Sequence, residues 1–454
     1  MPVLPLLVTA SAIAAIALCL LYFKRIGIRG LDVSWIYYPN TVVVYGLWVG
    51  SILTFMVCSF KKSRPFPDRI PQTRFLCLVP AYNEAAVIRN SVESLLRQNY
   101  PNALVEIVVV FDGTDGTGEA ARGLGVRVIE TPAPGSGKHV GLARAFDRLL
   151  GTDDGRYVCV FDADNVVDSE FLRTMNNAIL ATGSRCLQGY HDVLNKRVNW
   201  VTKAMWCGTA ASSRLYNQGR YSGIGNALIC GTGWCCQGSL VKRHWPTIRT
   251  QTEDIELNGL LLLGEGVRVA WVPEARFYDE KPNNLWVAVG QRRRWMTGHL
   301  RVFRYLGWRC LRESFRRKDI ALFEIFLYYA VPIAMSIAVV QFFGVLTGIS
   351  LGVLSVSGPL ATGEAQFTLG AITVGYIMGY QIIGFTLENR QWPRGVLYSF
   401  YTVVFSAVVW TMALVWAWFS MNRSDWMSHT PHVARAVSGP AIDANLPVTV
   451  KGRT

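Results

Sequence analysis

The chain of 454 residues is 51% hydrophobic and only 17% charged, which is too apolar for an ordinary soluble enzyme, so part of it is expected to lie in a lipid bilayer. Its net charge of +14 fits the basic cytoplasmic flanks of membrane spans, and because no nucleic-acid-binding signature accompanies it, nucleic acid is not expected as a partner. The ten cysteines show no Cys-x-x-Cys spacing, which argues against a zinc site or a disulfide framework and fits a reducing, cytoplasmic setting.

Two apolar runs open the chain, at residues 2–23 and 41–60, and each is long enough to cross a bilayer. The first is not expected to be a cleavable signal peptide, because no basic stretch precedes it and no clear cleavage site follows. Basic residues at 61–74 outnumber those at 24–29, so the positive-inside rule places the end of the second run in the cytoplasm. We therefore predict two transmembrane helices within residues 1–60 and a cytoplasmic domain over 61–290.

Strands and helices alternate from residue 75 to about residue 272. Strands are predicted at 75–79, 105–111, 126–130 and 157–161. A turn is predicted at 80–84 and is followed by a helix through residue 96. A second helix is predicted at 141–150. This alternation predicts an α/β fold, with a mostly parallel sheet and helices on both of its faces.

Two carboxylates, Asp162 and Asp164, directly follow the predicted strand at 157–161. Alternate residues of an extended chain point to the same side, so both can face one ligand at the carboxyl end of the strand, where open α/β sheets bind their ligands. Hard oxygen ligands of this kind suit Mg²⁺ or Mn²⁺. The alternative is a solvated acidic turn, because so short a motif is common.

Thr252, Glu253 and Asp254 stand ahead of a helical run that continues through Leu263. This spacing places two carboxylates at the start of a helix, where one of them could take a proton from an attacking hydroxyl group. An acidic residue at a helix start is also an ordinary capping choice.

Two further clusters combine polar and aromatic groups. Gln291, Arg294 and Trp295 on a predicted helix offer an amide, a guanidinium and an indole, a set that can hold a leaving diphosphate and stack on a sugar ring. In a second cluster, two glycines give the backbone conformational freedom beside a tryptophan ring on which a sugar could stack, as a carbohydrate channel requires. Its members are Gly231, Thr232, Gly233 and Trp234.

The C-terminal part returns to membrane character. Residues 291–320 are basic and aromatic and suit the membrane interface, with a solvated basic helix as the alternative. Apolar runs at 322–356, 367–387 and 396–420 predict transmembrane helices within 321–420. The first run contains Pro332, so it is either one tilted helix or a broken pair. Residues 421–454 are expected to form a flexible tail.

The ordered set of Asp112, the Asp162 pair, the Asp254 cluster and the Gln291 cluster, with apolar spans on both sides, resembles the processive family-2 inverting glycosyltransferases. This group includes the cellulose, chitin, hyaluronan and poly-N-acetylglucosamine synthases. The resemblance covers about 75–300, and the Gln-x-x-Arg-Trp motif is its most specific part. It implies a GT-A-like α/β nucleotide-sugar-binding domain inserted between transmembrane helices.

The resemblance also implies roles for individual residues. Asp254 matches the general base, and Asp164 matches the metal ligand in the motif that it shares with Asp162. Gln291, Arg294 and Trp295, together with the neighbouring Glu253 and the cluster at 231–234, match the gate for diphosphate and acceptor. The residues that match the nucleotide-sugar site are Pro80, Tyr82, Asn83, Glu84, Asp112, Lys138 and Asp162.

The function implied by the resemblance is that of a multi-pass enzyme of the plasma or inner membrane. It would polymerise a β-linked glycan from UDP-glucose or UDP-N-acetylglucosamine with Mg²⁺ or Mn²⁺. The growing glycan would be its acceptor, and a channel through its own spans would release the product. Accessory export proteins could take part as partners. Two alternatives stay open: transfer of one sugar to a lipid, and binding of a nucleotide sugar without turnover. Intact Asp164 and Asp254 count against the second alternative.

Overall fold

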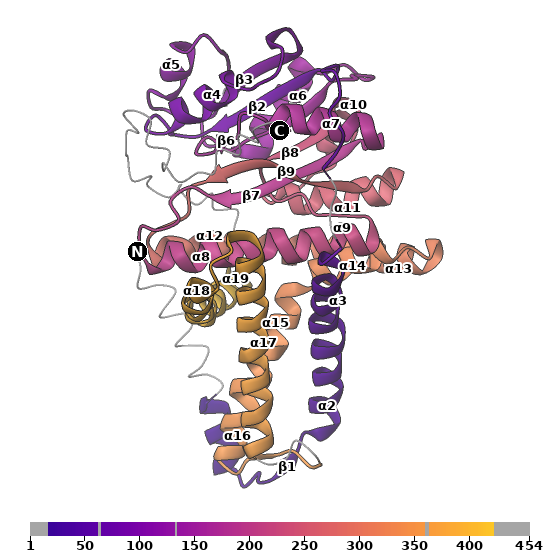
Figure 1. Ribbon diagram of the computed structural model, residues 1–454. Coiled ribbons are helices and arrows are strands. Elements are labelled where there is room, and N and C mark those ends of the chain that lie inside the picture. The colour runs from indigo at the N-terminus through magenta and orange to yellow at the C-terminus, as the bar shows by residue number, and fades with distance from the viewer. Residues whose placement is uncertain (1–16, 62–64, 132–133, 359–362, 422–454) are drawn as a thin grey trace.

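The computed structural model describes residues 17–61, 65–131, 134–358 and 363–421. An α/β domain forms one end of the molecule, several helices run across its base, and longer helices extend away from it (Figure 1). Most of the first apolar run and all of the tail from 422 lie outside the described residues. Of that first run, residues 17–23 are helical, in a helix that continues to residue 25.

The α/β domain is built on one sheet of eight strands in the order β4-β3-β2-β5-β8-β7-β9-β6. Its first half is parallel, as the alternation predicted, but β8 runs antiparallel between β5 and β7, and β6 runs antiparallel to β9. The sheet is therefore mixed, and its second half was not predicted. The strands are β2 (Phe75–Ala81), β3 (Val105–Phe111), β4 (Arg127–Glu130), β5 (Tyr157–Val160), β6 (Val166–Val167), β7 (Cys186–Val193), β8 (Trp234–Gln237) and β9 (Val269–Asp279).

Helices cover both faces of the sheet, as predicted, because alternate strand residues point to opposite sides. Phe75, Cys77 and Val79 of β2 pack into one hydrophobic core, whereas Leu76 and Leu78 pack into the other. The first core is closed by α4 (Ile88–Leu96), α5 (Thr117–Arg122) and α7 (Phe171–Thr182). The second is closed by α6 (Lys138–Leu149), α10 (Gly238–His244) and α11 (Glu253–Glu265).

A disulfide joins Cys159 of β5 to Cys235 of β8, which are directly opposite each other in the antiparallel pair. The cysteine spacing gave no sign of it, because the two residues are 76 positions apart and only the strand register brings them together. The expectation that the cysteines form no disulfide framework is corrected to this extent.

Several helices run across the base of the α/β domain (Figure 1). The side chain of Asn199 caps the first of them by accepting a hydrogen bond from Thr202 N, and that of Asn284 caps another by accepting from Trp286 N. The basic segment predicted for the membrane interface forms the last two. The helices are α8 (Trp200–Ala211), α9 (Gln218–Ile224), α12 (Leu285–Val302) and α13 (Trp308–Arg317).

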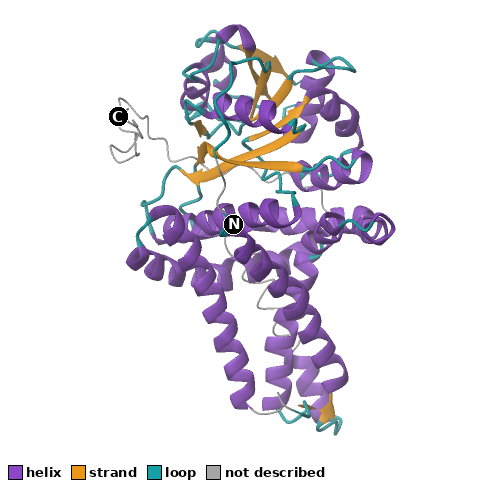
Figure 2. Cartoon of the chain, turned by 45° about the vertical axis from the view of Figure 1, so that its right-hand side comes forward, coloured by secondary structure: helices purple, strands orange, loops and turns teal. Residues whose placement is uncertain are grey.

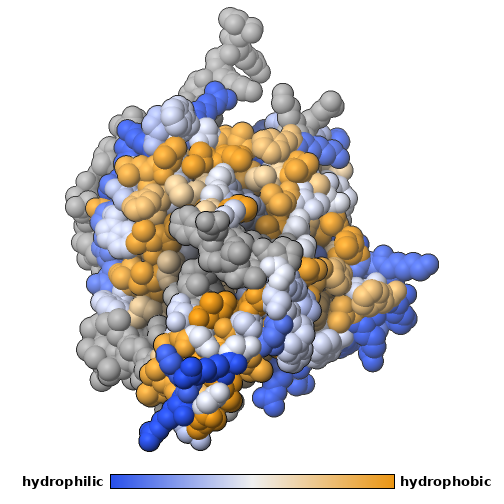
Figure 3. All heavy atoms as spheres, turned by 90° about the horizontal axis from the view of Figure 1, so that it is seen from below, coloured by the Kyte–Doolittle hydropathy of each residue, from blue (hydrophilic) through white to orange (hydrophobic). Residues whose placement is uncertain are grey.

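Three of the described helices, Ser34–Ser59, Gly370–Asn389 and Trp392–Ser420, are long and apolar enough to cross a membrane. A fourth is added if the pair Ile320–Tyr329 and Val331–Val340 counts as one span. That pair bends by 52°, so the apolar run with Pro332 is broken, one of the two forms expected for it. Figure 2 shows the long helices extending from the base. When the molecule is viewed from the far end of these helices, hydrophobic side chains cover much of its surface (Figure 3). The elements of the candidate spans are α2 (Ser34–Val43), α3 (Gly50–Ser59), α14 (Ile320–Tyr329), α15 (Val331–Val340), α17 (Gly363–Asn389), α18 (Trp392–Phe405) and α19 (Thr411–Ser420), and α16 (Leu346–Ser350) follows α15 in the chain.

The segment formed by α18 and α19 packs against the helices at the base rather than standing apart from them. Phe405, Val409 and Met412 join a hydrophobic cluster with residues of α8 and α12, and Leu414 and Ala417 join another with α12. This burial distinguishes it from the other two candidate spans, because 39% of its apolar stretch is buried, against 6% and 11%. The segment thus forms part of the floor beneath α12.

Candidate active site

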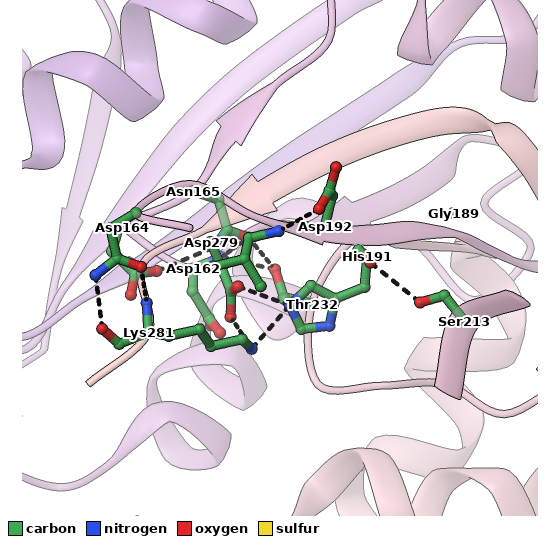
Figure 4. Close-up of polar contacts among 12 residues, drawn as sticks. Asp162, Asp164, Asn165, Gly189, His191, Asp192, Ser213, Thr232, Asp279 and Lys281 are labelled. Atoms are coloured by element: carbon green, nitrogen blue, oxygen red, sulfur yellow. Dashed lines mark hydrogen bonds and ion pairs between the residues drawn. The ribbon is translucent and has the colours of Figure 1, made fainter. Parts of the chain in front are cut away.

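The two predicted carboxylates lie just beyond the end of β5, as their spacing indicated (Figure 4). The backbone of this turn is fixed by Thr232, whose hydroxyl oxygen accepts a hydrogen bond from Asp162 N at 2.9 Å. Asp164 Oδ1 accepts a hydrogen bond from Asn165 Nδ2 at 2.9 Å. Asp162 and Asp164 both line the same cavity at this edge of the sheet.

Lys138 joins this edge to the start of α11. Its Nζ donates to Asp162 Oδ1 and to the carbonyl oxygen of Gly231, both at 2.7 Å, and lies 3.2 Å from Glu253 Oε1. Burial alone would lower the pKa of this ammonium group, but the carboxylates of Asp162, Glu253 and Asp254 raise it above its ordinary value. Lys138 thus stays charged at the centre of the site.

Asp112 holds the turn that delivers Lys138. Its Oδ2 accepts from Gly137 N at 2.7 Å, and its Oδ1 accepts from Ser136 Oγ at 2.9 Å and also from the hydroxyl group of Thr131. Gly137 has a φ of 102°, which a residue with a side chain rarely adopts, so the glycine permits the turn into α6. The carboxylate is therefore engaged with its own chain at the cavity wall.

Asp254 lies in the first turn of α11, where the sequence placed it. Burial raises the pKa of its carboxyl group to about 7, the charge of Glu253 adds to this shift, and Lys138 opposes it. A carboxylate that titrates near neutral pH is suited to accept a proton from a hydroxyl group. The electrostatics of the described site therefore favour Asp254 as a base.

The helix α12 lies very close to the segment that precedes α11. A Cβ atom on Gly298 would lie 2.1 Å from the hydroxyl oxygen of Thr252, so only glycine allows this approach. The contact brings Gln291, Arg294 and Trp295 of α12 to the same space as Asp254. The ring of Trp295 lies 6.3 Å from that of Trp410, between ring centres.

One cavity of about 1200 Å³ connects these groups. It begins at the carboxyl edge of the sheet, passes Asp254, and continues between α12 and the membrane-side helices to Met335, Phe405 and Trp410. The predicted site residues that line it are Pro80, Tyr82, Glu84, Asp112, Lys138, Asp162, Asp164, Gly231, Thr232, Glu253, Asp254, Gln291, Arg294 and Trp295.

Three predicted residues do not line the cavity. Trp234 is only 1% exposed and stacks on Trp245 in a hydrophobic core, which contradicts the expectation that it presents a platform to a sugar. A side chain on Gly233 would collide with Phe277, so this glycine serves backbone packing. Asn83 adopts a φ of 54° and accepts a hydrogen bond from Thr114 N at 2.8 Å, which fixes the turn after β2.

The sequence reading missed a second polar cluster on the cavity wall (Figure 4). Asp279 ends β9, and its carboxylate lies 2.7 Å from Lys281 Nζ and 2.8 Å from His191 Nε2. Burial would raise the pKa of Asp279, but these two neighbours lower it to about 2. Asp279 and Lys281 could have been found, because they follow a strand at the same edge of the sheet. His191 of β7 carried no sequence signal.

His299 was also missed, although it stands one helical turn beyond Trp295 on α12. It lines the cavity, is buried, and packs edge-on against Tyr328 with ring centres 4.7 Å apart. Burial lowers the pKa of His299 to about 4, so its ring is neutral at physiological pH. It can serve there as a neutral hydrogen-bonding group.

The fit of a divalent cation depends on the two carboxylates. Among the described residues, no group of three or more His, Cys, Asp or Glu side chains is placed to hold a metal. Asp162 is paired with Lys138 and Asp164 accepts a hydrogen bond from Asn165, so a metal would share these carboxylates with partners from the chain. One or two carboxylates suit Mg²⁺ or Mn²⁺ when substrate phosphates supply the remaining ligands.

The chain is similar to several known proteins. The chain is 22% identical over 356 residues to a protein of Bacillus subtilis described as a probable glycosyltransferase, YdaM, covering 75% of this chain and 81% of the relative. It is 27% identical over 271 residues to the beta-monoglucosyldiacylglycerol synthase of Synechocystis, covering 58% and 56%. Among solved structures, the mannosyltransferase PcManGT of Pyrobaculum calidifontis, in complex with GDP-Man and Mn²⁺, aligns with a TM-score of 0.49 and 18% identity, covering 83% of this chain and 99% of that one.

The family described as "Glycosyltransferase like family 2" matches residues 71–298, half of the chain. The match begins before β2 and ends within α12, so it contains the carboxylate edge, Asp254 and the Gln291 cluster. The chain is a member of glycosyltransferase family 2.

Proposed function

We propose that the chain is an inverting glycosyltransferase that moves a sugar from UDP-glucose or UDP-N-acetylglucosamine to an acceptor hydroxyl group at the membrane surface. The observation that supports this most is the single cavity that holds Lys138, Asp164, Asp254 and Trp295. The proposed donor site, base and acceptor-side aromatic ring thus share one cavity.

The donor half lies at the carboxyl edge of the sheet. Pro80, Tyr82 and Glu84 line the cavity where a nucleotide would enter, and Lys138 and Arg294 place cations where a diphosphate would depart. Asp164, with Asp162 beside it, would hold Mg²⁺ or Mn²⁺, which supplies further positive charge to the leaving diphosphate when bound. These groups favour departure of UDP.

The acceptor half faces Asp254. Its carboxylate accepts the proton of the attacking hydroxyl group while the hydroxyl oxygen bonds to the anomeric carbon and the bond from that carbon to the diphosphate breaks. Because the attack comes from the face opposite the diphosphate, the configuration of the anomeric carbon is inverted. A single base suffices, because no covalent sugar intermediate forms. Gln291 and Trp295 would hold the acceptor sugar beside the base.

The membrane setting is part of the proposal. The candidate spans fit transmembrane helices before residue 60 and within 321–420, with residues 291–320 at the interface and 61–290 in the cytoplasm. On this arrangement the enzyme extends a β-linked glycan and passes it through its own spans of the plasma or inner membrane, alone or with accessory export proteins. The continuation of the cavity from Asp254 to Met335 and Trp410 supports this route.

A second candidate function is transfer of one sugar to a membrane lipid. It is favoured by the segment of α18 and α19, which packs along α8 and α12 at the floor of the cavity and would close a glycan channel there. A relative that is a glycolipid synthase adds support. In this function the cavity opens sideways to the bilayer.

The test uses detergent-purified protein, Mn²⁺ or Mg²⁺, and a panel of radiolabelled UDP-sugars. Ethanol-insoluble label from one donor is expected for a polysaccharide synthase and identifies its sugar. Label confined to an organic-soluble lipid would support the second function instead. No transfer from any nucleotide sugar would overturn both.

A further inference from the structure

Arg292, between Gln291 and Arg294, has an unusual setting for an arginine. The residue is only 6% exposed, yet it lines the cavity on the membrane side of α12. Its guanidinium carbon lies 4.6 Å from the ring centre of Trp295, 5.4 Å from that of Phe405 and 5.8 Å from that of Trp410. Three aromatic rings from two segments thus enclose one cation.

This cation has no carboxylate partner in the described part of the chain. Its guanidinium donates to the side-chain oxygen of Gln291, while its Nε is buried without a hydrogen-bond partner among the described residues. The negative charge of Asp279 raises the pKa of Arg292, but the Asp279 carboxylate is already paired with Lys281 and His191. Burial lowers the pKa of Arg292 to about 10, so it remains charged at neutral pH. A buried charge is costly unless it is paired, which indicates that the partner is a ligand.

The walls around Arg292 indicate what kind of ligand fits. Val331 and Met335 of α15 and Phe405 of α18 contribute apolar surface to the cavity at this level. A guanidinium group binds phosphate through its planar fork of donors, and the adjoining apolar wall suits acyl chains. In the proposed function Lys138 and Arg294 serve the donor phosphates, whereas Arg292 is enclosed by Phe405 and Trp410 of the candidate span Trp392–Ser420. A phosphate beside Arg292 therefore belongs to a molecule that enters from the bilayer.

We propose that Arg292 binds the phosphate of a membrane phospholipid whose headgroup hydroxyl is the acceptor, or the primer from which a glycan grows. The inference rests on the proposed function and names its acceptor class. In the transfer, the headgroup oxygen bonds to the anomeric carbon, and the bond from that carbon to the diphosphate breaks. The diphosphate leaves with the electron pair, and the hydroxyl proton passes to Asp254.

The experiment uses the full chain in phosphatidylcholine vesicles with radiolabelled UDP-sugar and Mn²⁺. Phosphatidylglycerol is compared with diacylglycerol of the same acyl chains, since both offer a hydroxyl group but only the first carries a phosphate. Phosphatidic acid, which has the phosphate without the headgroup hydroxyl, is added as a competitor. Each assay is run on the wild-type chain, Arg292→Gln, Arg292→Lys and Arg293→Gln. Arg293 is the matched control, because its guanidinium lies 4.1 Å from the ring centre of Trp416 and outside the cavity lining.

We expect transfer to phosphatidylglycerol to exceed transfer to diacylglycerol, and phosphatidic acid to compete. Arg292→Gln should raise the KM for phosphatidylglycerol about tenfold or more with little change in kcat, since a charge-assisted hydrogen bond is lost. Arg292→Lys should recover part of this loss, and Arg293→Gln should keep the wild-type KM. A merely structural role for Arg292 would lower kcat or stability without changing the preference for phosphate.

Equal use of the two lipids, or equal effects of the Arg292 and Arg293 variants, would overturn the inference. So would label found only in a glycan with no lipid attached. Slow hydrolysis of the UDP-sugar by water, measured on the wild-type chain without acceptor lipid, keeps the two proposals apart. Hydrolysis without lipid transfer contradicts the acceptor assignment alone, whereas the absence of both reactions contradicts the proposed function itself.

Discussion

Lys138 Nζ and Glu253 Oε1 lie 3.2 Å apart, and this ion pair joins the carboxylate edge of the sheet to the helix that carries Asp254. Both partners are within reach of Asp254 and act on it with opposite sign: Glu253 raises the pKa of that carboxyl group, and Lys138 lowers it. If Lys138 contacts the donor as proposed, donor binding and the strength of Asp254 as a base would be coupled through this lysine.

The pH dependence of the reaction should reveal this coupling. Asp254 must be ionised to act as a base, so kcat/KM is expected to fall as the pH drops below about 7. Glu253→Gln removes a like charge, lowers the pKa of Asp254, and should move this acidic limb to lower pH. Lys138→Gln should move it to higher pH and weaken donor binding as well. Steady-state rates between pH 5 and 9 would measure both shifts, and shifts of the same sign would contradict the assignment.

Replacement of Asp254 by asparagine should reduce kcat on the order of a hundredfold or more, because the variant lacks a general base. The variant should nevertheless be at least as stable as the wild type at pH 8. The pKa of Asp254 is raised in the folded protein, so ionisation of this carboxyl group lowers the free energy of unfolding. The loss is fully present above about pH 7 and is absent at pH values below the pKa that the group has in the unfolded chain. Thermal unfolding at pH 8 and kcat measured on the same sample test both expectations. Near-normal turnover would refute the role of Asp254 as the general base.

Gly298→Ala should separate α12 from the start of α11. The added Cβ atom would meet Thr252 at 2.1 Å, so we expect a loss of about 1–3 kcal/mol in stability and a larger loss of activity as Trp295 moves away from Asp254. Gly379→Ala is the control, since nothing lies within 4 Å of a Cβ atom there. Melting temperatures and initial rates compare the two, and identical behaviour would show that the close approach does not matter.

The two tryptophans predicted for the acceptor side should respond differently to alanine. Trp234 is in the core, so Trp234→Ala should cost about 3–5 kcal/mol of stability. Trp295 lines the cavity, so Trp295→Ala should mainly raise the KM for acceptor. Unfolding in denaturant and acceptor titrations distinguish these effects. An intact fold with a raised acceptor KM in the Trp234 variant would restore the platform role.

Removal of divalent metal by a chelator should abolish transfer, and Mn²⁺ or Mg²⁺ should restore it in the wild type. Asp164→Asn should shift the metal concentration for half-maximal rate upward by about tenfold or more, because one oxygen ligand loses its charge. Asp168→Asn, whose residue lies outside the cavity lining, provides the control. A metal requirement that does not change in the Asp164 variant would exclude that residue as the ligand.

The parts of this protein that depend on local pattern could be predicted from the order of its residues. The apolar run of β2 predicted a strand, the Asp162 pair marked a strand end, and Asp254 was placed at a helix start. In each case the neighbours along the chain decide the conformation, so the pattern was sufficient.

Contacts between groups that are distant along the chain could not be predicted in this way. The antiparallel β8 buries Trp234 and pairs Cys159 with Cys235, because strand register, not spacing, sets these contacts. His191 of β7 reaches the carboxylate of Asp279 because β7 and β9 pair in the sheet, and Arg292 is enclosed by the rings of Phe405 and Trp410, which arrive from the segment of α18 and α19. Such contacts are fixed by the packing of whole elements against one another, and a single sequence does not record that packing.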